Sequence, residues 1–169
     1  KWVNHLPGIV VQRIALENNF IWCASKDSII KFDKINDSFF VYKEKDGFAG
    51  SYIYSIAVDK SGNKWFGTSR NGVSKFDGIN WTTYDGITGK QLDAILAIAF
   101  DNLNNVWFGC LSGIVKYDGN SFFYFGYYPN QIWSIYVNRK NYVFASDLAR
   151  VYKFNGQSWD IIGDDNHGS

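Results

Sequence analysis

The chain repeats itself, and the repeat limits the folds open to it. Residues 62–84 read GNKWFGTSRNGVSKFDGINWTTY, and residues 104–125 read NNVWFGCLSGIVKYDGNSFFYF. The two segments keep their aromatic and glycine positions while their polar residues change, which is typical of one structural unit that has been copied. Such a unit cannot bury its apolar face alone, so each copy has to stack against its neighbours.

A tryptophan followed by small or apolar residues marks the register of the repeat. It stands at Trp22, Trp65 and Trp107, and a weaker fourth copy places Val143, followed by Phe-Ala-Ser, at the same position. The spacing of about 40 residues is typical of propeller blades and lies outside the usual length of leucine-rich or ankyrin units. Four copies then fill the chain.

Within one copy the apolar residues alternate with a period of two. In the second copy we expect strands at 54–58, 64–68, 72–76 and 81–84, because these runs are rich in β-branched and aromatic residues. Asx-Gly pairs favour the tight turns between them, and no long segment has helical spacing with a cap. The sequence therefore predicts an all-β fold, a β-propeller with four repeats of four short antiparallel strands. Aromatic residues, 19% of the chain, suit the contact between twisted blades.

The repeats divide a single propeller domain over residues 1-169 into blades and two ends. We expect blades at 10-43, 53-85, 95-126 and 131-163, followed by a tail at 164-169. Residues 1–5 match the fourth-strand pattern of 81–84, and residues 1-9 are expected to form the last strand of a preceding blade. The final blade has a fourth strand of its own, so one strand is surplus to a closed ring. This favours an arc of a larger propeller, with a closed four-bladed ring as the alternative.

The repeat resembles that of the two-component regulator propeller family. The resemblance rests on Trp-Phe-Gly-Thr at 65–68, Lys-Phe-Asp-Gly at 75–78 and Trp-Thr-Thr-Tyr at 81–84, and it covers nearly the whole chain. That family occurs in periplasmic sensor domains of bacterial hybrid histidine kinases and in some secreted proteins. The resemblance implies a periplasmic or extracellular location and ligands derived from polysaccharides. Propellers similar to streptogramin lyase share the Gly-Asn-x-Trp turn, so the motif specifies a fold more firmly than a function.

Charge and composition exclude several kinds of partner. The chain has 17 basic and 16 acidic residues, and the basic residues are scattered instead of forming the stripe of a nucleic-acid-binding surface. No apolar run approaches the roughly 18 residues of a membrane span, and no Cys or His pair has zinc spacing. We expect no metal and no cofactor. Cys23 and Cys110 fall in non-adjacent copies, too far apart for a disulfide, and are predicted to be buried free thiols.

The sequence offers no catalytic constellation, so we predict that the protein is not an enzyme. No nucleophile elbow, Ser/His/Asp set or phosphate-cradling loop is present. The activity of streptogramin lyases depends on a histidine within the propeller, and neither histidine of this chain lies in the four predicted blades. The recurring Asp33, Asp77 and Asp118, with Asn155 in the fourth copy, are expected to accept hydrogen bonds from turn backbone. The segment 59–63 is read as a hairpin turn in preference to a calcium loop.

The loops between blades, and those between second and third strands, open on the same face of a propeller, and they are the least repetitive segments here. Loops on a rigid scaffold commonly carry function. Aromatic side chains there are candidates to stack on a sugar ring or a partner's apolar patch, and charged ones to give polar contacts. The candidate ligand- or partner-binding residues are Tyr52, Arg70, Lys90, Tyr127, Tyr128, Trp133, Asp147 and Arg150. Packing between blade ends is the alternative role for each of them.

Two functions follow as hypotheses. In the first, the chain is a non-catalytic recognition module, a ligand-sensing extracytoplasmic domain that takes an oligosaccharide ligand. In the second, it is a structural or scaffolding propeller of a secreted or cell-surface complex, with protein partners at its loops and open blade edges. Both place it outside the cytoplasm, and neither involves nucleic acid.

Overall fold

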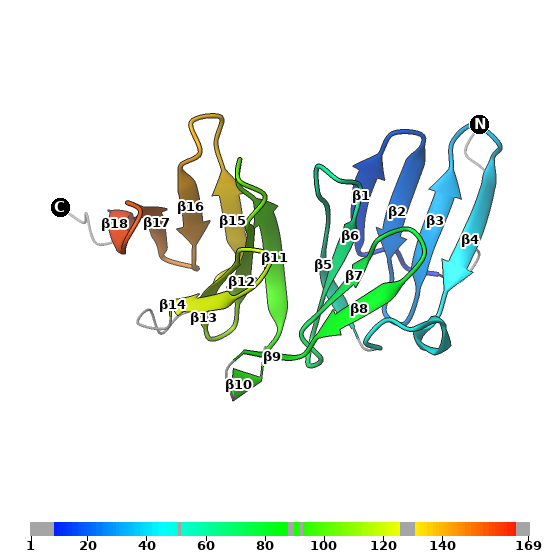
Figure 1. Ribbon diagram of the computed structural model, residues 1–169, viewed down its shortest axis with the longest axis horizontal. Helices are drawn as coiled ribbons and strands as arrows, with labels where there is room; N and C mark the ends of the chain where they lie inside the picture. Colours follow the sequence, from blue (N-terminus) through cyan, green and yellow to red (C-terminus); the bar gives the residue numbers. More distant parts are fainter. Residues whose placement is uncertain (1–8, 51, 88–89, 92, 126–130, 165–169) are drawn as a thin grey trace.

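The computed structural model describes residues 9–50, 52–87, 90–91, 93–125 and 131–164. These residues form four four-stranded antiparallel sheets, and the strands of each follow one another in chain order (Figure 1). The first sheet is β1 (Arg13–Glu17), β2 (Phe20–Ala24), β3 (Ile29–Asp33) and β4 (Ser38–Tyr42), and the second is β5 (Ile53–Val58), β6 (Lys64–Thr68), β7 (Val73–Phe76) and β8 (Trp81–Tyr84). The third is β11 (Ile95–Phe100), β12 (Val106–Cys110), β13 (Gly113–Tyr117) and β14 (Phe122–Phe125), and the fourth is β15 (Ser134–Val137), β16 (Val143–Ser146), β17 (Arg150–Phe154) and β18 (Trp159–Asp164). The predicted all-β propeller architecture is confirmed.

Short connections join the sheets. A turn of 3-10 helix, η1 (Glu44–Asp46), links the first two, and a small hairpin of β9 (Gly86–Ile87) and β10 (Lys90–Gln91) links the second and third. The strands predicted for the second copy agree with β5 to β8 within a residue at each end. The described part of the chain contains no helix that is both long and apolar enough to cross a membrane.

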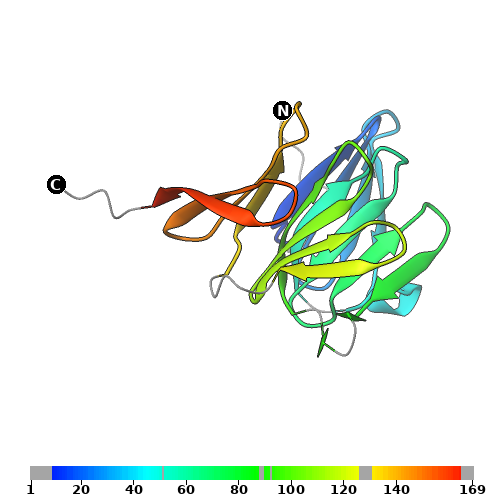
Figure 2. The same ribbon diagram turned by 60° about the vertical axis from the view of Figure 1, so that its left-hand side comes forward.

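The sheets fan out around their first strands. β5 lies beside β1, β11 beside β5, and β15 beside β11, so each first strand adjoins the next. Figures 1 and 2 show the first and fourth sheets at the two ends of the fan. Among the described elements, β1 and β15 make no extensive contact with each other.

The same aromatic contact recurs at all three junctions between sheets. Each tryptophan stacks on a ring from the fourth strand of its own sheet, with 5.9 Å between ring centroids in every case. These pairs face two rings on the third and fourth strands of the next sheet. The groups of four are Trp22, Tyr42, Phe76 and Trp81 at the first junction; Trp65, Tyr84, Tyr117 and Phe122 at the second; and Trp107, Phe125, Phe154 and Trp159 at the third. Offset and edge-on arrangements of this kind are the favoured geometries of aromatic pairs.

Two glycines allow the sheets to come this close. A Cβ atom on Gly67 would lie 2.7 Å from the Cβ of Ile95 in the third sheet, and one on Gly109 would lie 2.8 Å from the carbonyl oxygen of Ile132. Real Cβ atoms do not approach other atoms so closely, so the Trp-Phe-Gly motif holds glycine because the next sheet passes directly over it.

The predicted turn roles of the acidic residues are confirmed. Asp59 accepts backbone N–H groups from Ser61 and Asn63 with one carboxylate oxygen, and the Trp65 indole N–H with the other at 3.0 Å. Burial alone would raise the pKa of Asp59, but hydrogen bonds from Trp65, Asn63 and Ser61 outweigh it, and the pKa is lowered. The 59–63 segment is therefore a hairpin turn that also fixes the buried tryptophan. The carboxylates of Asp33, Asp77 and Asp118 and the side-chain amide oxygen of Asn155 each accept N–H groups two and three residues ahead.

The predicted register of the fourth copy is wrong by one residue. Trp22, Trp65 and Trp107 each pair across the sheet with a lysine of the third strand, and in the fourth sheet the residue that pairs with the corresponding Lys153 is Phe144. Val143 points to the opposite face and packs in the cluster that contains Trp107. Successive residues of a strand face opposite sides, so the slip exchanges the two faces of β16.

The outer face of the first sheet is apolar and partly exposed: Ile30 on it is fully buried, whereas Ile14, Leu16 and Phe39 are exposed. By register this face carries Ile14, Leu16, Ile21, Cys23, Ile30, Phe32, Phe39 and Val41, and none of the other three described sheets packs on it. Ile14 and Leu16 are 62% and 66% exposed. Both cysteines are free thiols and Cys110 is buried, as expected, but the prediction that Cys23 is buried is wrong because it is only partly buried on this face.

Replacing Trp65 with alanine should cost about 3–5 kcal/mol of unfolding free energy, because the ring is almost fully buried between two sheets. Chemical denaturation would measure the loss. The matched control is Trp133→Ala, which removes a ring that is 47% exposed and should cost far less. Equal losses in the two variants would contradict the aromatic-junction account.

The corrected register predicts that the smaller Val143 side chain contributes more to stability than the larger Phe144 ring. Val143→Ala should cost about 1–3 kcal/mol, because it leaves a cavity against the third sheet. Phe144→Ala should cost less, because that ring lies on the outer face of the last sheet. If thermal unfolding showed a larger loss of stability for Phe144→Ala, the register predicted from the sequence would be the correct one.

Candidate functional site

The connections between sheets and the turns between second and third strands lie on one side, the lower edge in Figure 1. Backbone hydrogen bonds tie each connection to a turn: Ser69 donates to the Tyr52 carbonyl, Leu111 to that of Ala94, and Trp133 to that of Ser146. We call this side the loop surface. It is the surface on which the sequence places the candidate binding residues.

Tyr52 and Arg70 lie close together on the loop surface. The Ser69–Tyr52 hydrogen bond of 2.9 Å joins the segment before β5 to the turn that carries Arg70. The Tyr52 hydroxyl accepts a hydrogen bond from the Gln12 side chain of the first sheet, and its ring lies 5.0 Å from that of Tyr54. Tyr52 is therefore fixed in place by two sheets while still partly exposed.

Trp133, Asp147 and Arg150 form a second group, on the fourth sheet. Trp133 is half-exposed beside the β16–β17 turn, and Asp147 is buried in that turn. The Asp147 carboxylate accepts the backbone N–H groups of Ala149 and Arg150, both at 2.7 Å, and the Tyr152 hydroxyl at 2.5 Å. Burial, with the bond to Asp147, raises the pKa of Tyr152. Asp147 thus shapes its own turn, which leaves Trp133 as the exposed member of the group and Arg150 as a partly exposed one.

The remaining candidates add little to these two groups. Lys90 lies in strand β10 of the connecting hairpin, whereas Tyr127 and Tyr128 fall outside the described residues. The Tyr52 and Trp133 groups belong to the second and fourth sheets, with the third between them. The structure therefore gives two separate clusters on one surface.

The sequence analysis missed two polar residues of the loop surface, Gln12 and Asp93. Each has a buried side-chain oxygen, Oε1 and Oδ1 respectively, without a hydrogen-bond partner among the described residues. Burial raises the pKa of Asp93, opposed by hydrogen bonds from Ser112 and Leu111. Their signal in the sequence is weak, because each simply precedes the first strand of a sheet, β1 or β11.

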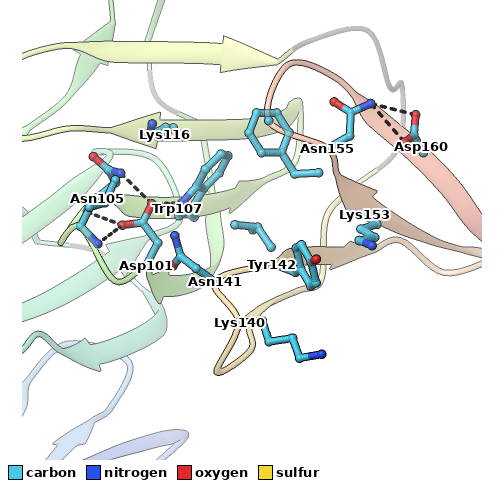
Figure 3. Close-up of a pocket in the computed structure, with 14 residues that line it drawn as sticks. Asp101, Asn105, Trp107, Lys116, Lys140, Asn141, Tyr142, Lys153, Asn155 and Asp160 are labelled. Atoms are coloured by element: carbon cyan, nitrogen blue, oxygen red, sulfur yellow. Dashed lines mark hydrogen bonds between the residues drawn. The ribbon is translucent and has the colours of Figure 1, made fainter.

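A pocket of about 580 Å³ opens between the third and fourth sheets at the opposite edge (Figure 3). It is bounded by the turns before β12, between β15 and β16, and between β17 and β18. Trp107, Val143 and Phe154 supply apolar walls, and Lys116, Lys140 and Lys153 line it as well. No candidate residue from the sequence lies there.

Comparison with known proteins finds neighbours of the same fold. No known sequence family matches the chain, and no curated protein matches it. Among solved structures, the extracellular domain of a hybrid two-component system from B. thetaiotaomicron has a TM-score of 0.79 at 16% identity, covering 94% of this chain and 22% of that one. Virginiamycin B lyase from Staphylococcus aureus has a TM-score of 0.77 at 13% identity, covering 97% of this chain and 59% of that one.

A third neighbour is PorZ, a surface component of the type-IX secretion system of Porphyromonas gingivalis. Its TM-score is 0.73 at 16% identity, with 97% of this chain and 29% of that one covered. The chain thus spans about a fifth of the two-component-system domain and a little over half of the lyase. At these identities the comparisons establish the propeller fold.

The two kinds of carboxylate in the structure should respond to pH with opposite signs. The pKa of Asp93 is raised on folding, so its contribution to stability is lost as the pH rises from about 4 through the folded value. Asp93→Asn should therefore raise the melting temperature at pH 7, and the gain should vanish near pH 3.

Asp118→Asn is the matched control. Hydrogen bonds from the backbone of Ser121 and Asn120 lower the pKa of Asp118, so its contribution is present above the unfolded pKa and lost as the pH falls. This variant should lose stability at pH 7. Losses of equal size at pH 7 in both variants would contradict the assignment for Asp93.

Proposed function

We propose that the chain is part of a non-catalytic β-propeller module that recognises a ligand through its loop surface. Its repeat favours the extracytoplasmic, ligand-sensing type of the two-component regulator propellers, with an oligosaccharide as ligand. The observation that carries the proposal is that the repeated and the non-repeated residues lie in different parts of the structure. The repeated residues build a rigid aromatic scaffold, while the non-repeated Tyr52, Arg70, Trp133 and Arg150 lie on one side of it.

The acidic side chains support a non-catalytic role. A general acid at neutral pH needs a raised pKa, whereas Asp33, Asp59, Asp77 and Asp118 all have lowered pKa values because they accept hydrogen bonds within their turns. Among the described residues Asp93 is the carboxylate whose pKa is raised, and its hydrogen-bonding partners, Ser112 and Leu111, include no second carboxylate. Acid–base catalysis by two carboxylates would need one group with a raised pKa close to a second, ionised carboxylate.

Two observations support a larger propeller. The first sheet exposes Ile14 and Leu16 on its outer face, and the fourth presents Phe144 and Tyr136 on its outer face. Both are the faces that the repeat covers with a neighbouring sheet at each internal junction. Further blades of the same protein fit these faces, because each internal junction is built from the same repeated positions.

The location proposed is periplasmic or extracellular. The similar structures include extracellular domains of two-component systems and a bacterial surface component. The likeness to PorZ also favours the second candidate function, a scaffolding propeller whose open apolar face binds protein. In this second function a protein partner binds that face, and no ligand binds the loop surface.

Binding of oligosaccharides to the 169-residue chain, measured by calorimetry across a panel of neutral and acidic glycans, tests the proposal. Trp133→Ala should weaken the binding of any glycan that the unchanged chain binds by about tenfold, because exposed aromatic anchors dominate such contacts. Phe123→Ala is the matched control: it removes a ring of similar exposure, 46%, from an outer strand, and should leave binding unchanged. Equal effects of the two variants, or no binding by any glycan, would favour the scaffold.

A further inference from the structure

We infer that the segment before β1, residues 1–8, covers the β3 side of the outer face of the first sheet and takes the place of the fourth strand of a preceding sheet. The segment lies outside the described residues, so its place is inferred from the face that it covers and from its sequence. The contact involves none of the loop-surface residues and goes beyond the proposed function.

The burial of Ile30 shows that the centre of this face is covered. Ile30 is 0% exposed, although none of the other three described sheets packs on its side of the first sheet. It belongs to none of the three apolar clusters that join neighbouring sheets. Its cross-strand partner on β2, Cys23, is partly buried, and burial raises the pKa of that thiol. The atoms that bury Ile30 therefore come from outside the four described sheets.

The internal junctions show what buries this position elsewhere in the protein. By strand register Ile30 corresponds to one residue in each following sheet: Ser74, Val115 and Tyr152. Each is at most 2% exposed, and the preceding sheet covers it: Val115 packs in the cluster of Trp65, and Tyr152 in that of Trp107. Ile30 is buried to the same degree without a described preceding sheet. Another part of the chain therefore occupies the place of that sheet.

The cover is narrower than a whole sheet. On the same face, Ile14 and Leu16 of β1 are 62% and 66% exposed, and Phe39 of β4 is 44% exposed. The counterparts of Ile14 in the second and third sheets, Ile56 and Ile98, pack against the cluster at the junction with the preceding sheet. A complete preceding sheet would cover β1 in the same way. The cover over Ile30 therefore has the extent of one strand and lies on the β3 side.

The opposite end of the fan shows a face of this repeat without such a cover. On the outer face of the fourth sheet, Tyr136 and Val151 are 62% and 41% exposed. Phe144, on the central strand β16, is only partly buried. None of the described apolar residues on that face is fully buried. Full burial of Ile30 is thus not a property that a terminal sheet has by itself.

Residues 1–8 have the position and the composition to supply the cover. Among the segments outside the described residues, this is the one that leads into β1 and carries large apolar side chains, at Trp2, Val3 and Leu6. Residues 1–5 also match the fourth-strand pattern of 81–84. Eight extended residues span about 26 Å, whereas β3 lies two strand spacings, about 10 Å, from β1. The segment is therefore long enough to reach the β3 side.

The thiol of Cys23 tests the cover, because it lies beside Ile30 on the same face. In the 169-residue chain, the combined substitution Trp2→Ser, Val3→Ser and Leu6→Ser should speed the alkylation of Cys23 by iodoacetamide by about tenfold, because the loss of buried apolar contacts releases the segment from the face.

Two controls accompany this measurement. Cys110, which is 1% exposed in the core, is the internal reference and should stay protected. Lys1→Ser with Asn4→Ser leaves the apolar side chains of the segment in place and should leave the Cys23 rate unchanged. Should the triple substitution also expose Cys110, Trp2→Ser alone gives the same comparison.

A double-mutant cycle tests the contact with Ile30 independently. Ile30→Ala and the triple serine substitution should each lower the midpoint of chemical denaturation. Combined, they should lower it by less than the sum, because both remove the same contact. With the Lys1→Ser and Asn4→Ser control in place of the triple substitution, the effects should add.

Three results would overturn the inference. Equal alkylation rates of Cys23 in the unchanged chain and in the triple variant would show that the segment does not cover the face. Strictly additive effects with Ile30→Ala would show that it does not contact Ile30. Protection of Cys23 that appears only as the protein concentration rises would assign the cover to a second copy of the chain. Glycan binding enters none of these measurements, so failure of the loop-surface proposal would be seen separately.

Discussion

The rest of the structure depends on the burial of one tryptophan between each sheet and the next. Trp22, Trp65 and Trp107 are at most 2% exposed, and each stacks on a ring of its own sheet and meets two rings of the following one. A single four-stranded sheet has no comparable core, so each copy gains its stability from its neighbour. The turn carboxylates also fix these tryptophans, because Asp59 and Asp101 accept hydrogen bonds from the indole N–H groups of Trp65 and Trp107.

This dependence explains why so much of the fold could be predicted from sequence. The spacing of tryptophan, glycine and Asx-Gly turns follows directly from the contacts that each copy has to make, so the strands of the second copy and the roles of Asp77 and Asp118 were predicted correctly. The fourth copy failed because Phe144 replaces the tryptophan and the neighbouring Val143 matches the pattern almost as well. Only the cross-strand pairing with Lys153 decides between them.

The candidate sites were less predictable, because they do not repeat. Loop composition placed Tyr52 and Arg70 on one surface, but it did not show that the Asp147 carboxylate would accept hydrogen bonds from its own turn and from Tyr152. The pocket between the third and fourth sheets has no sequence signature. Of the lysines that line it, Lys116 and Lys153 stand at the repeated position that pairs with the tryptophan or with Phe144, whereas Lys140 lies in a turn. Such a site is a property of packing.

The central claim is that a sheet of this repeat is complete only when a neighbour covers it. Sedimentation of the 169-residue chain over a range of concentrations tests this most directly, because the open face with Ile14 and Leu16 lacks such a cover among the described sheets. The account predicts association that grows with concentration and weakens when Leu16 is replaced by a charged residue. A compact monomer at all concentrations, unfolding in one cooperative step, would contradict it and would favour four copies that close on themselves.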